Sequence, residues 1–296
     1  MYYIIKTKMM DDFLTLQNFI LNKQNDDKPF FIGRLSGNET RLTGDILSGN
    51  SVSQDLLINM LYVAGISFDK TADIELYIQS YDIAVSHCDM LGVWDGNMRM
   101  QAENYYKHLD TKHIKIPQIA AQALEPYYFM DSCRYQFHKI FEKKRVLIIS
   151  SHYETVKSQI DKRSVLFNQP IFSDSTHFFV YKPPQQNGGS HNGQSWVKHA
   201  DEMRRDLLDI KENKFDFDIA LVSCGGFGMI ISDYIFCELK SSVMYVGGAL
   251  QIYFGIMGQR WVTNDRINRH MNSEWTYPMD EDKPKHPNLC ENKCYW

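Results

Sequence analysis

The chain has 296 residues, of which 44% are hydrophobic and 23% are charged, and its net charge at pH 7 is −4. This composition excludes a disordered chain and is sufficient for a large buried core. The slight negative charge gives no basic field for nucleic acid, and no apolar run reaches the roughly 20 residues that span a bilayer.

The N-terminus and the cysteines indicate a cytoplasmic protein. Residues 1–10 lack the charged, apolar and small-residue order of a signal peptide. Six cysteines are too few for a disulfide scaffold in a chain of this length, so we expect reduced thiols. Cys290 and Cys294 have Cys-x3-Cys spacing, but no further ligands follow at comparable spacing, so no metal site is predicted there.

The first strand is expected to end in a polar corner. Apolar residues at helical spacing predict a helix over Asp11–Leu21, and the run Pro29–Ile32 predicts a buried strand. The residues at the end of that strand are Arg34, Ser36, Gly37, Asn38 and Glu39. An arginine, small residues and a carboxylate at such a corner can bind a diphosphate and hold a sugar hydroxyl or a cation. Alternatively, Arg34 and Glu39 form a surface ion pair worth about 0–1 kcal/mol.

A second polar loop is expected near Trp94. Helices are predicted over Ser51–Gly65 and Thr71–Ser80, followed by a strand over Asp82–Val85. In the loop that follows, Trp94 can stack on a sugar or base while Asp95 acts as a general base. Equally, Trp94 is a core residue and Asp95 belongs to a simple turn.

The strand Val146–Ile149 is the clearest in the chain and follows a helix predicted near residues 99–108. Ser151, His152 and Glu154 come next, but residues so close in sequence seldom converge as a catalytic triad. We therefore expect Ser151 to cap the following helix, with Glu154 completing a capping box. His152 remains a candidate for contact with phosphate or substrate.

A glycine-rich loop follows the strand Phe178–Tyr181. It begins at Lys182, contains two prolines and several glycines up to Gly193, and is either a mobile lid or a passive surface loop. Ser195 is expected to cap the next helix.

The segment 216–261 predicts a βαβ unit. Its two buried strands, Asp218–Val222 and Val243–Val246, each lead into glycines. The glycines are Gly225, Gly226 and Gly228 in the first turn, and Gly247 and Gly248 in the second, with Gln251 beyond. Such turns let backbone N–H groups approach a phosphate, although they also occur as ordinary tight turns.

Together these elements predict an α/β fold, an open and mainly parallel Rossmann-like sheet with helices on both faces. We expect a single domain over 1–296, with possible halves at 1–140 and 141–261 and a C-terminal strap at 262–296. Polar residues gather at the strand ends, which fits a site for a nucleotide or a nucleotide-activated substrate.

The second half also resembles a widespread set of bacterial and viral proteins. The resemblance is carried by ordered segments across the chain: Leu124 to Pro126, Lys182 to Gln185, Ser195 and Trp196, Phe217 to Gly225, Gly247 to Gln251, Phe254 to Trp261, and Cys294 to Trp296. This set is more remotely similar to glycosyltransferases of the GT-D type, which transfer a sugar from a nucleotide donor.

The resemblance implies a transferase that moves a sugar from a nucleotide-sugar, most simply a UDP-sugar, to a glycan or other hydroxyl acceptor. GT-D enzymes carry an Arg-x-Gly-Asp-Gly-Glu-like corner whose Asp-x-Glu holds a divalent metal. Here Arg34 and Glu39 match, but Gly37 stands where the first acid would be, so a metal is not carried over.

The expected catalytic residues are Glu39 and Asp95. The expected donor-binding residues are Arg34, Ser36, Gly37, Asn38, His152, Lys182, Gly225, Gly226, Gly248 and Gln251. The alternatives are a non-catalytic nucleotide-sugar-binding subunit of glycan assembly, or another nucleotide-cofactor enzyme. Neither glycine turn matches the dinucleotide-binding fingerprint that many such enzymes carry.

Overall fold

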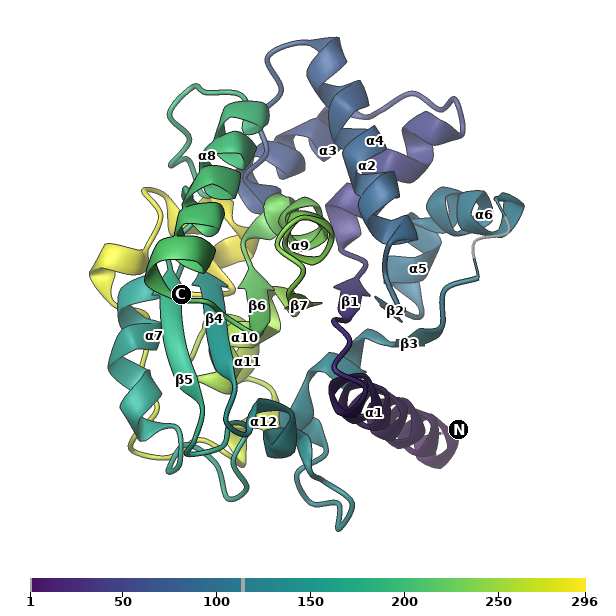
Figure 1. The fold of residues 1–296 in the computed structure, drawn as a ribbon. Helices are drawn as coiled ribbons and strands as arrows, with labels where there is room; N and C mark the ends of the chain where they lie inside the picture. The colour runs from purple at the N-terminus through teal and green to yellow at the C-terminus, as the bar shows by residue number, and fades with distance from the viewer. Residues whose placement is uncertain (1, 113–114) are drawn as a thin grey trace.

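The computed structural model describes residues 2–112 and 115–296, and its centre is one parallel sheet with helices on both faces (Figure 1). The seven strands are β1 (Phe31–Arg34), β2 (Met90–Val93), β3 (Gln118–Ala120), β4 (Arg145–Ser150), β5 (His177–Tyr181), β6 (Ile219–Ser223) and β7 (Ser242–Tyr245). Their order is β3-β2-β1-β7-β6-β4-β5, and every pairing is parallel. The open Rossmann-like α/β fold is therefore confirmed.

The helices connect the strands and cover the sheet. They are α1 (Tyr2–Asn25), α2 (Gly37–Leu47), α3 (Gln54–Asn59), α4 (Thr71–Ser86), α5 (Asn97–Gln101), α6 (Glu103–Thr111), α7 (Tyr153–Gln159), α8 (Trp196–Asp209), α9 (Gly228–Cys237), α10 (Leu250–Tyr253), α11 (Gln259–Val262) and α12 (Asp265–Asn268). The hydroxyl of Ser195 accepts from the N–H of Val197, which confirms the predicted cap of α8.

Two apolar layers enclose the sheet because successive strand residues point to opposite faces. In β4, Val146 and Ile148 belong to the apolar cluster that includes residues of α1, α7 and α10. Leu147 and Ile149 belong to the one that includes residues of α4, α8 and α9. Both faces are thus covered, as a run of consecutive apolar residues requires.

The strand predicted over Asp82–Val85 is wrong, because these residues continue α4. Tyr77, Tyr81, Ala84 and Val85 are buried at helical spacing on one side of that helix. The strand comes later, at Met90–Val93, within residues that the sequence pattern assigned to a loop.

The capping box predicted for Ser151 and Glu154 is also wrong. His152 occupies the N-cap position of α7, and no side-chain cap comes from that residue. The cap is long-range: the carboxylate of Asp282 accepts from the N–H groups of Glu154 and Thr155, at 3.0 and 2.8 Å.

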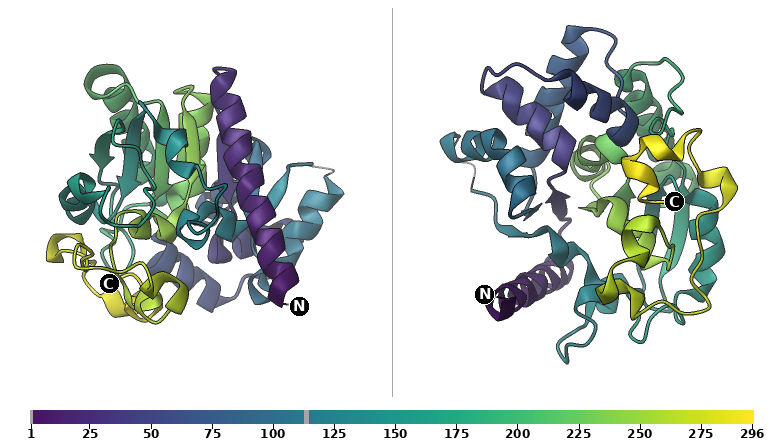
Figure 2. Two further views of the ribbon diagram at one scale, coloured as in Figure 1. Left: turned by 90° about the horizontal axis from the view of Figure 1, so that it is seen from below. Right: turned by 180° about the vertical axis from the view of Figure 1, so that it is seen from behind.

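The C-terminal segment folds back on the sheet. In the left view of Figure 2 it lies, in yellow, at one end of the strands. In the part of the chain that the structure describes, no helix combines the length and apolar character needed to cross a lipid bilayer.

Candidate functional site

A cavity of about 500 Å³ lies at the carboxyl ends of the strands. Residues that follow β1, β2, β4, β6 and β7 line it, together with the last residues of the chain. Strands β4 and β6 are neighbours in the sheet. The chain leaves β4 for β5 on one side of this pair, and it leaves β6 for β7 on the other side. Ligands in open α/β folds bind at such a switch point.

Arg34 reaches the cavity from the end of β1 and is already paired. Its Nη2 donates to Oε1 of Glu125 at 2.7 Å, and its Nη1 donates to the carbonyl of Val246. The ring of Trp94 lies 4.6 Å from the guanidinium carbon. The partner of Arg34 is thus a buried carboxylate, and the alternative of a surface pair with Glu39 is wrong.

Glu39 lies in the first turn of α2 and is buried beside the cavity. Burial raises the pKa of its carboxyl above the usual range, and the Glu291 carboxylate adds to this effect while the Ser36 hydroxyl opposes it. A carboxylate with a raised pKa takes up a proton more readily, which suits a general base.

His152 follows β4, and its ring stacks on Trp296 with a centroid separation of 5.4 Å. Burial lowers the pKa of the imidazole, although the Asp282 carboxylate acts in the opposite direction. At neutral pH the ring is therefore uncharged and presents polar nitrogen atoms without a net charge.

Both glycine turns reach the cavity. Gly225 and Gly247 have φ values of +58° and +65°, which glycine adopts without the steric cost of a side chain. A side chain at Gly225 would also collide with the Ala64 carbonyl, 2.5 Å from the position of its Cβ. Gly248 packs against Tyr295, which brings the C-terminal segment onto the second turn.

Several buried polar atoms at the cavity have no hydrogen-bond partner within the chain. They are His152 Nε2, Asn187 Oδ1, Trp261 Nε1 and Trp296 Nε1. Buried polar groups are normally paired, since an unmade hydrogen bond costs about 1–3 kcal/mol. Each of these atoms is enclosed by protein, and each belongs to a residue that lines the cavity.

The structure brings most of the predicted site residues together. The cavity is lined by Arg34, Ser36, Gly37, Asn38, Glu39, His152, Gly225 and Gly248. Four other predicted residues do not line it: Asp95, Lys182, Gly226 and Gln251.

The four residues outside the lining have other surroundings. Asp95 is exposed next to Trp94, and the ammonium of Lys182 donates to the carbonyl of Glu281. Gly226 accepts a hydrogen bond from the Tyr77 hydroxyl at 2.8 Å. Gln251 is buried, and its amide nitrogen donates to the carbonyl of Ile256.

The loop predicted as a lid is tied to its neighbours. The N–H of Gly188 donates to the carbonyl of Tyr62, and the carbonyl of Gly188 accepts from the N–H of His286. Asn187 lines the cavity from this loop.

Sequence reasoning missed the roles of Glu125, Arg41 and Arg260 at the cavity. Glu125 stands in the Leu124–Pro126 segment, which carried part of the resemblance, but no local pattern assigns it to Arg34. Arg41 is one helical turn beyond the polar corner, and Arg260 donates to the Tyr295 hydroxyl at 2.9 Å. Both arginines form loose, partly exposed ion pairs, Arg41 with Asp45 at 3.7 Å and Arg260 with Glu291 at 3.8 Å.

A divalent metal does not fit the cavity of this chain. Gly37 contributes no carboxylate beside Glu39, and within residues 2–112 and 115–296 no cluster of three His, Cys, Asp or Glu ligands forms at the cavity. Of the other two acids in the cavity lining, Glu125 is already bound to Arg34, and Glu291 forms an ion pair with Arg260 at 3.8 Å.

No protein-family model, curated protein or solved structure matches this chain.

Proposed function

We propose that the cavity binds a nucleotide-sugar, most simply a UDP-sugar, and that the protein transfers the sugar to a hydroxyl of a glycan or another acceptor. The observation that carries the proposal is the buried carboxylate of Glu39 in a cavity at the carboxyl ends of the strands, whose lining also includes Arg41 and Arg260. The resemblance of the Arg34–Glu39 corner to that of GT-D glycosyltransferases supports the same assignment.

The leaving diphosphate is the most demanding part of such a substrate because negative charge develops on it as the glycosidic bond breaks. Arg41 and Arg260 lie at the cavity wall and are partly exposed, so both can turn toward an anion. The first turn of α2 adds backbone N–H groups with partial positive charge. Arg34 shares its charge with Glu125 and holds this wall in place.

Glu39 is assigned as the general base. Its carboxylate takes the proton of the acceptor hydroxyl while that oxygen bonds to the anomeric carbon and the bond to the diphosphate oxygen breaks. Trp261 and Trp296 line the cavity, and aromatic rings supply apolar surface on which a sugar can pack.

Two features favour a second candidate, a nucleotide-sugar-binding subunit without turnover. Glycine occupies position 37, and the charge of Arg34 is balanced by Glu125. The first removes a ligand for a cation that would neutralise a leaving diphosphate, and the second lowers the net charge at Arg34. Neither prevents binding.

The test uses the purified protein with a panel of UDP-, GDP- and CMP-sugars, NAD and S-adenosylmethionine in thermal unfolding. One class of nucleotide-sugar should raise the melting temperature, because a ligand that binds only the native state stabilises it. That donor is then assayed for sugar release and transfer. Release that is lost in Glu39→Gln and kept in Asp95→Asn supports the transferase; binding without release supports the second candidate. A shift with NAD or S-adenosylmethionine alone contradicts both.

A further inference from the structure

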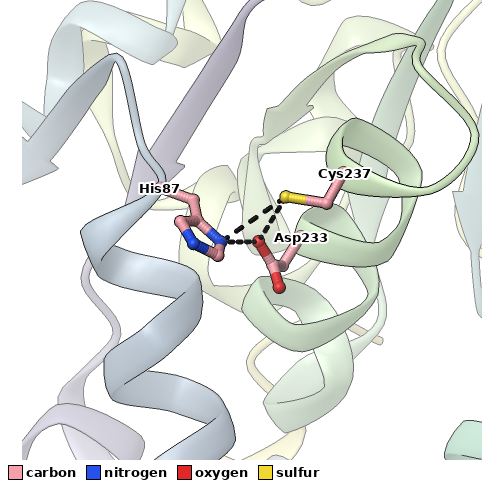
Figure 3. Close-up of side chains that lie close together, drawn as sticks. All are labelled: His87, Asp233 and Cys237. Atoms are coloured by element: carbon pink, nitrogen blue, oxygen red, sulfur yellow. Dashed lines mark hydrogen bonds and ion pairs between the residues drawn. The ribbon is translucent and has the colours of Figure 1, made fainter.

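A histidine, an aspartate and a cysteine converge away from the cavity (Figure 3). His87 Nδ1 lies 2.7 Å from Asp233 Oδ1, and Cys237 Sγ lies 3.3 Å from the same oxygen and 3.5 Å from the same nitrogen. The three potential ligand atoms all lie within 4.8 Å of one another. We call this group the His87 cluster.

The end of α4 and one face of α9 position the His87 cluster. His87 is the residue that ends α4, and Asp233 and Cys237 are one turn apart on α9, so they share a face of that helix. The two helices pack directly, and just beyond the end of α4 Cys88 Sγ lies 4.0 Å from Met229 Sδ of α9. The cluster therefore rests on a packed helix pair, which keeps the spacing of its three side chains.

The His87 cluster and the cavity lie at opposite ends of the sheet. His87 precedes β2 and Cys237 precedes β7, which places the cluster near the amino ends of the strands. The cavity lies at their carboxyl ends. Any ligand of the cluster is therefore separate from the proposed sugar donor.

We propose that the His87 cluster is a zinc site, with His87 Nδ1, Asp233 Oδ1 and Cys237 Sγ as protein ligands and a water molecule as the fourth. Imidazole, thiolate and carboxylate are the ligands that Zn²⁺ takes in tetrahedral sites. The side chain of His87 is 44% exposed and that of Asp233 21%, so solvent reaches the position left for water.

The observed separations are close to those of a tetrahedral site. Bond lengths of about 2.3 Å to sulfur and about 2.0 Å to nitrogen and oxygen place sulfur roughly 3.5 Å from the other two ligand atoms. The contacts of Cys237 already have this length, at 3.3 and 3.5 Å. Only the hydrogen bond between His87 and Asp233 must open, from 2.7 Å to about 3.3 Å, when the metal replaces the shared proton.

The same residues do not make a cysteine nucleophile with a histidine base. In such a triad the nucleophile and the carboxylate contact different ring nitrogens of the histidine. Here Cys237 and Asp233 both contact Nδ1 of His87. Convergence on one point is the arrangement that a metal ion requires.

The proposed metal ties α4 to α9. Residues 87 and 233 are 146 positions apart in the sequence, so the unfolded chain does not bring the three ligands together. Zinc binding should therefore stabilise the folded protein, independently of whether a nucleotide-sugar binds.

The test uses the full chain, freed of metal with a chelator and titrated with Co²⁺ as a spectroscopic probe. We expect one equivalent to bind with tetrahedral d–d bands and a sulfur-to-cobalt charge-transfer band, and Zn²⁺ to displace it. Cys237→Ser should abolish the charge-transfer band, and His87→Gln should weaken Zn²⁺ binding by at least about 100-fold, beyond the 10- to 100-fold loss seen when only a residue bound to a ligand is changed.

Cys133→Ser is the matched control, because Cys133 is an exposed cysteine outside the cluster. It should bind Co²⁺ and Zn²⁺ as the wild type does, and Zn²⁺ should raise the melting temperature of both proteins but not that of Cys237→Ser. The proposal is overturned if the wild type gives no charge-transfer band, or if that band persists in Cys237→Ser. A nucleotide-sugar assay has no bearing on this result, so the two proposals fail separately.

Discussion

The guanidinium of Arg34 and the carboxylate of Glu125 form a buried ion pair, with 2.7 Å between Nη2 and Oε1 and side-chain exposures of 9% and 4%. The second oxygen of Glu125 accepts a hydrogen bond from the Tyr127 hydroxyl at 2.9 Å. The carbonyl of Leu124, the preceding residue, accepts from the Tyr253 hydroxyl at 2.6 Å. The end of β1 is thereby joined to a segment 91 residues later.

We expect Glu125→Ala to lower the free energy of unfolding by about 3–5 kcal/mol, because it leaves the buried charge of Arg34 without its partner. Urea denaturation measures the change. Glu103→Ala is the control: Glu103 forms an exposed i,i+4 pair with Lys107, and its loss should cost about 0.5 kcal/mol or less. Equal losses in the two variants would show that the Arg34 pair is not buried as described.

The ion pair between Arg34 and Glu125 could not be predicted from the sequence, although the strand that ends at Arg34 could. The strand that ends at Arg34 was predictable because Pro29–Ile32 is a local apolar run that overlaps it. Its partner was not, because no local pattern connects residues 34 and 125. The cap of α7 by Asp282 and the stacking of His152 on Trp296 were missed for the same reason.

The strand misassigned to Asp82–Val85 has a different cause. A short apolar run is compatible with a strand or with one face of a helix, and periodicity over four residues does not separate them. The burial of Tyr77 and Tyr81 extends the helical spacing through these residues, and packing on α9 then decides the structure.

Most of the cavity was predictable from the sequence. The residues that follow parallel strands all lie at the same edge of the sheet, so the polar residues after each strand were expected to lie together.

Glu39→Gln is expected to lower sugar transfer by about 10²- to 10⁴-fold, the usual contribution of a general base. The wild-type rate should rise with pH through the raised pKa of Glu39, since only the deprotonated carboxylate accepts the proton. Asp95→Asn, which changes an exposed carboxylate outside the cavity lining, is the control and should keep most of the activity. A loss in Asp95→Asn with normal activity in Glu39→Gln would reverse the assignment of the base.

The same substitution should stabilise the protein at neutral pH. The pKa of Glu39 is higher in the folded protein than in the unfolded chain, so the folded protein holds the proton up to a higher pH. The contribution of this group to stability is therefore full below the unfolded pKa and is lost as pH rises to the folded pKa. At neutral pH the raised pKa of this carboxyl therefore costs stability, which glutamine does not, and we expect a gain of about 1 kcal/mol in thermal unfolding. The gain should vanish below pH 4, where the carboxyl is protonated in both states.

His152 should make folding sensitive to mild acid. Burial lowers the pKa of its imidazole, so the unfolded chain takes up a proton at a higher pH than the folded protein does. Stability is therefore complete above the unfolded pKa of about 6.5 and is lost as pH falls below it. The stability advantage of the wild type over His152→Gln should shrink between pH 7.5 and pH 5.5 in urea denaturation. His138 and His270 shift in the same direction, so the comparison is between the two proteins at each pH.

Gly248→Ala tests whether the C-terminal segment is seated on the second glycine turn. A Cβ at Gly248 would lie 2.4 Å from Tyr295 Cε1, so the ring must move. We expect a loss of about 1–3 kcal/mol in stability, the usual cost of overpacking, and a change in tryptophan fluorescence as Trp296 leaves His152. The control is Gly37→Ala, whose Cβ would meet only Met98 Cε at 3.7 Å. Equal stability of the two variants would contradict the described contact.

Gly37→Asp tests the proposed link between this chain and metal-dependent sugar transfer. The substitution creates an Asp-x-Glu pair with Glu39, and the open space around Gly37 admits the side chain. Two carboxylates at this spacing supply oxygen ligands for Mn²⁺ or Mg²⁺. We expect Mn²⁺ with UDP to raise the melting temperature of Gly37→Asp more than that of the wild type, by the equivalent of about 2.7 kcal/mol at 100 times the dissociation constant.

Gly37→Asn is the matched control for Gly37→Asp, because it has the same shape without the charge and should behave as the wild type does. The His87 cluster is present in all three proteins, so metal bound there changes all three melting temperatures equally and does not affect their differences. If Mn²⁺ shifts the wild type and Gly37→Asp equally, the corner at Arg34–Glu39 does not present its side chains to a diphosphate-bound metal. The assignment of a donor site to this end of the sheet would then rest on the cavity alone.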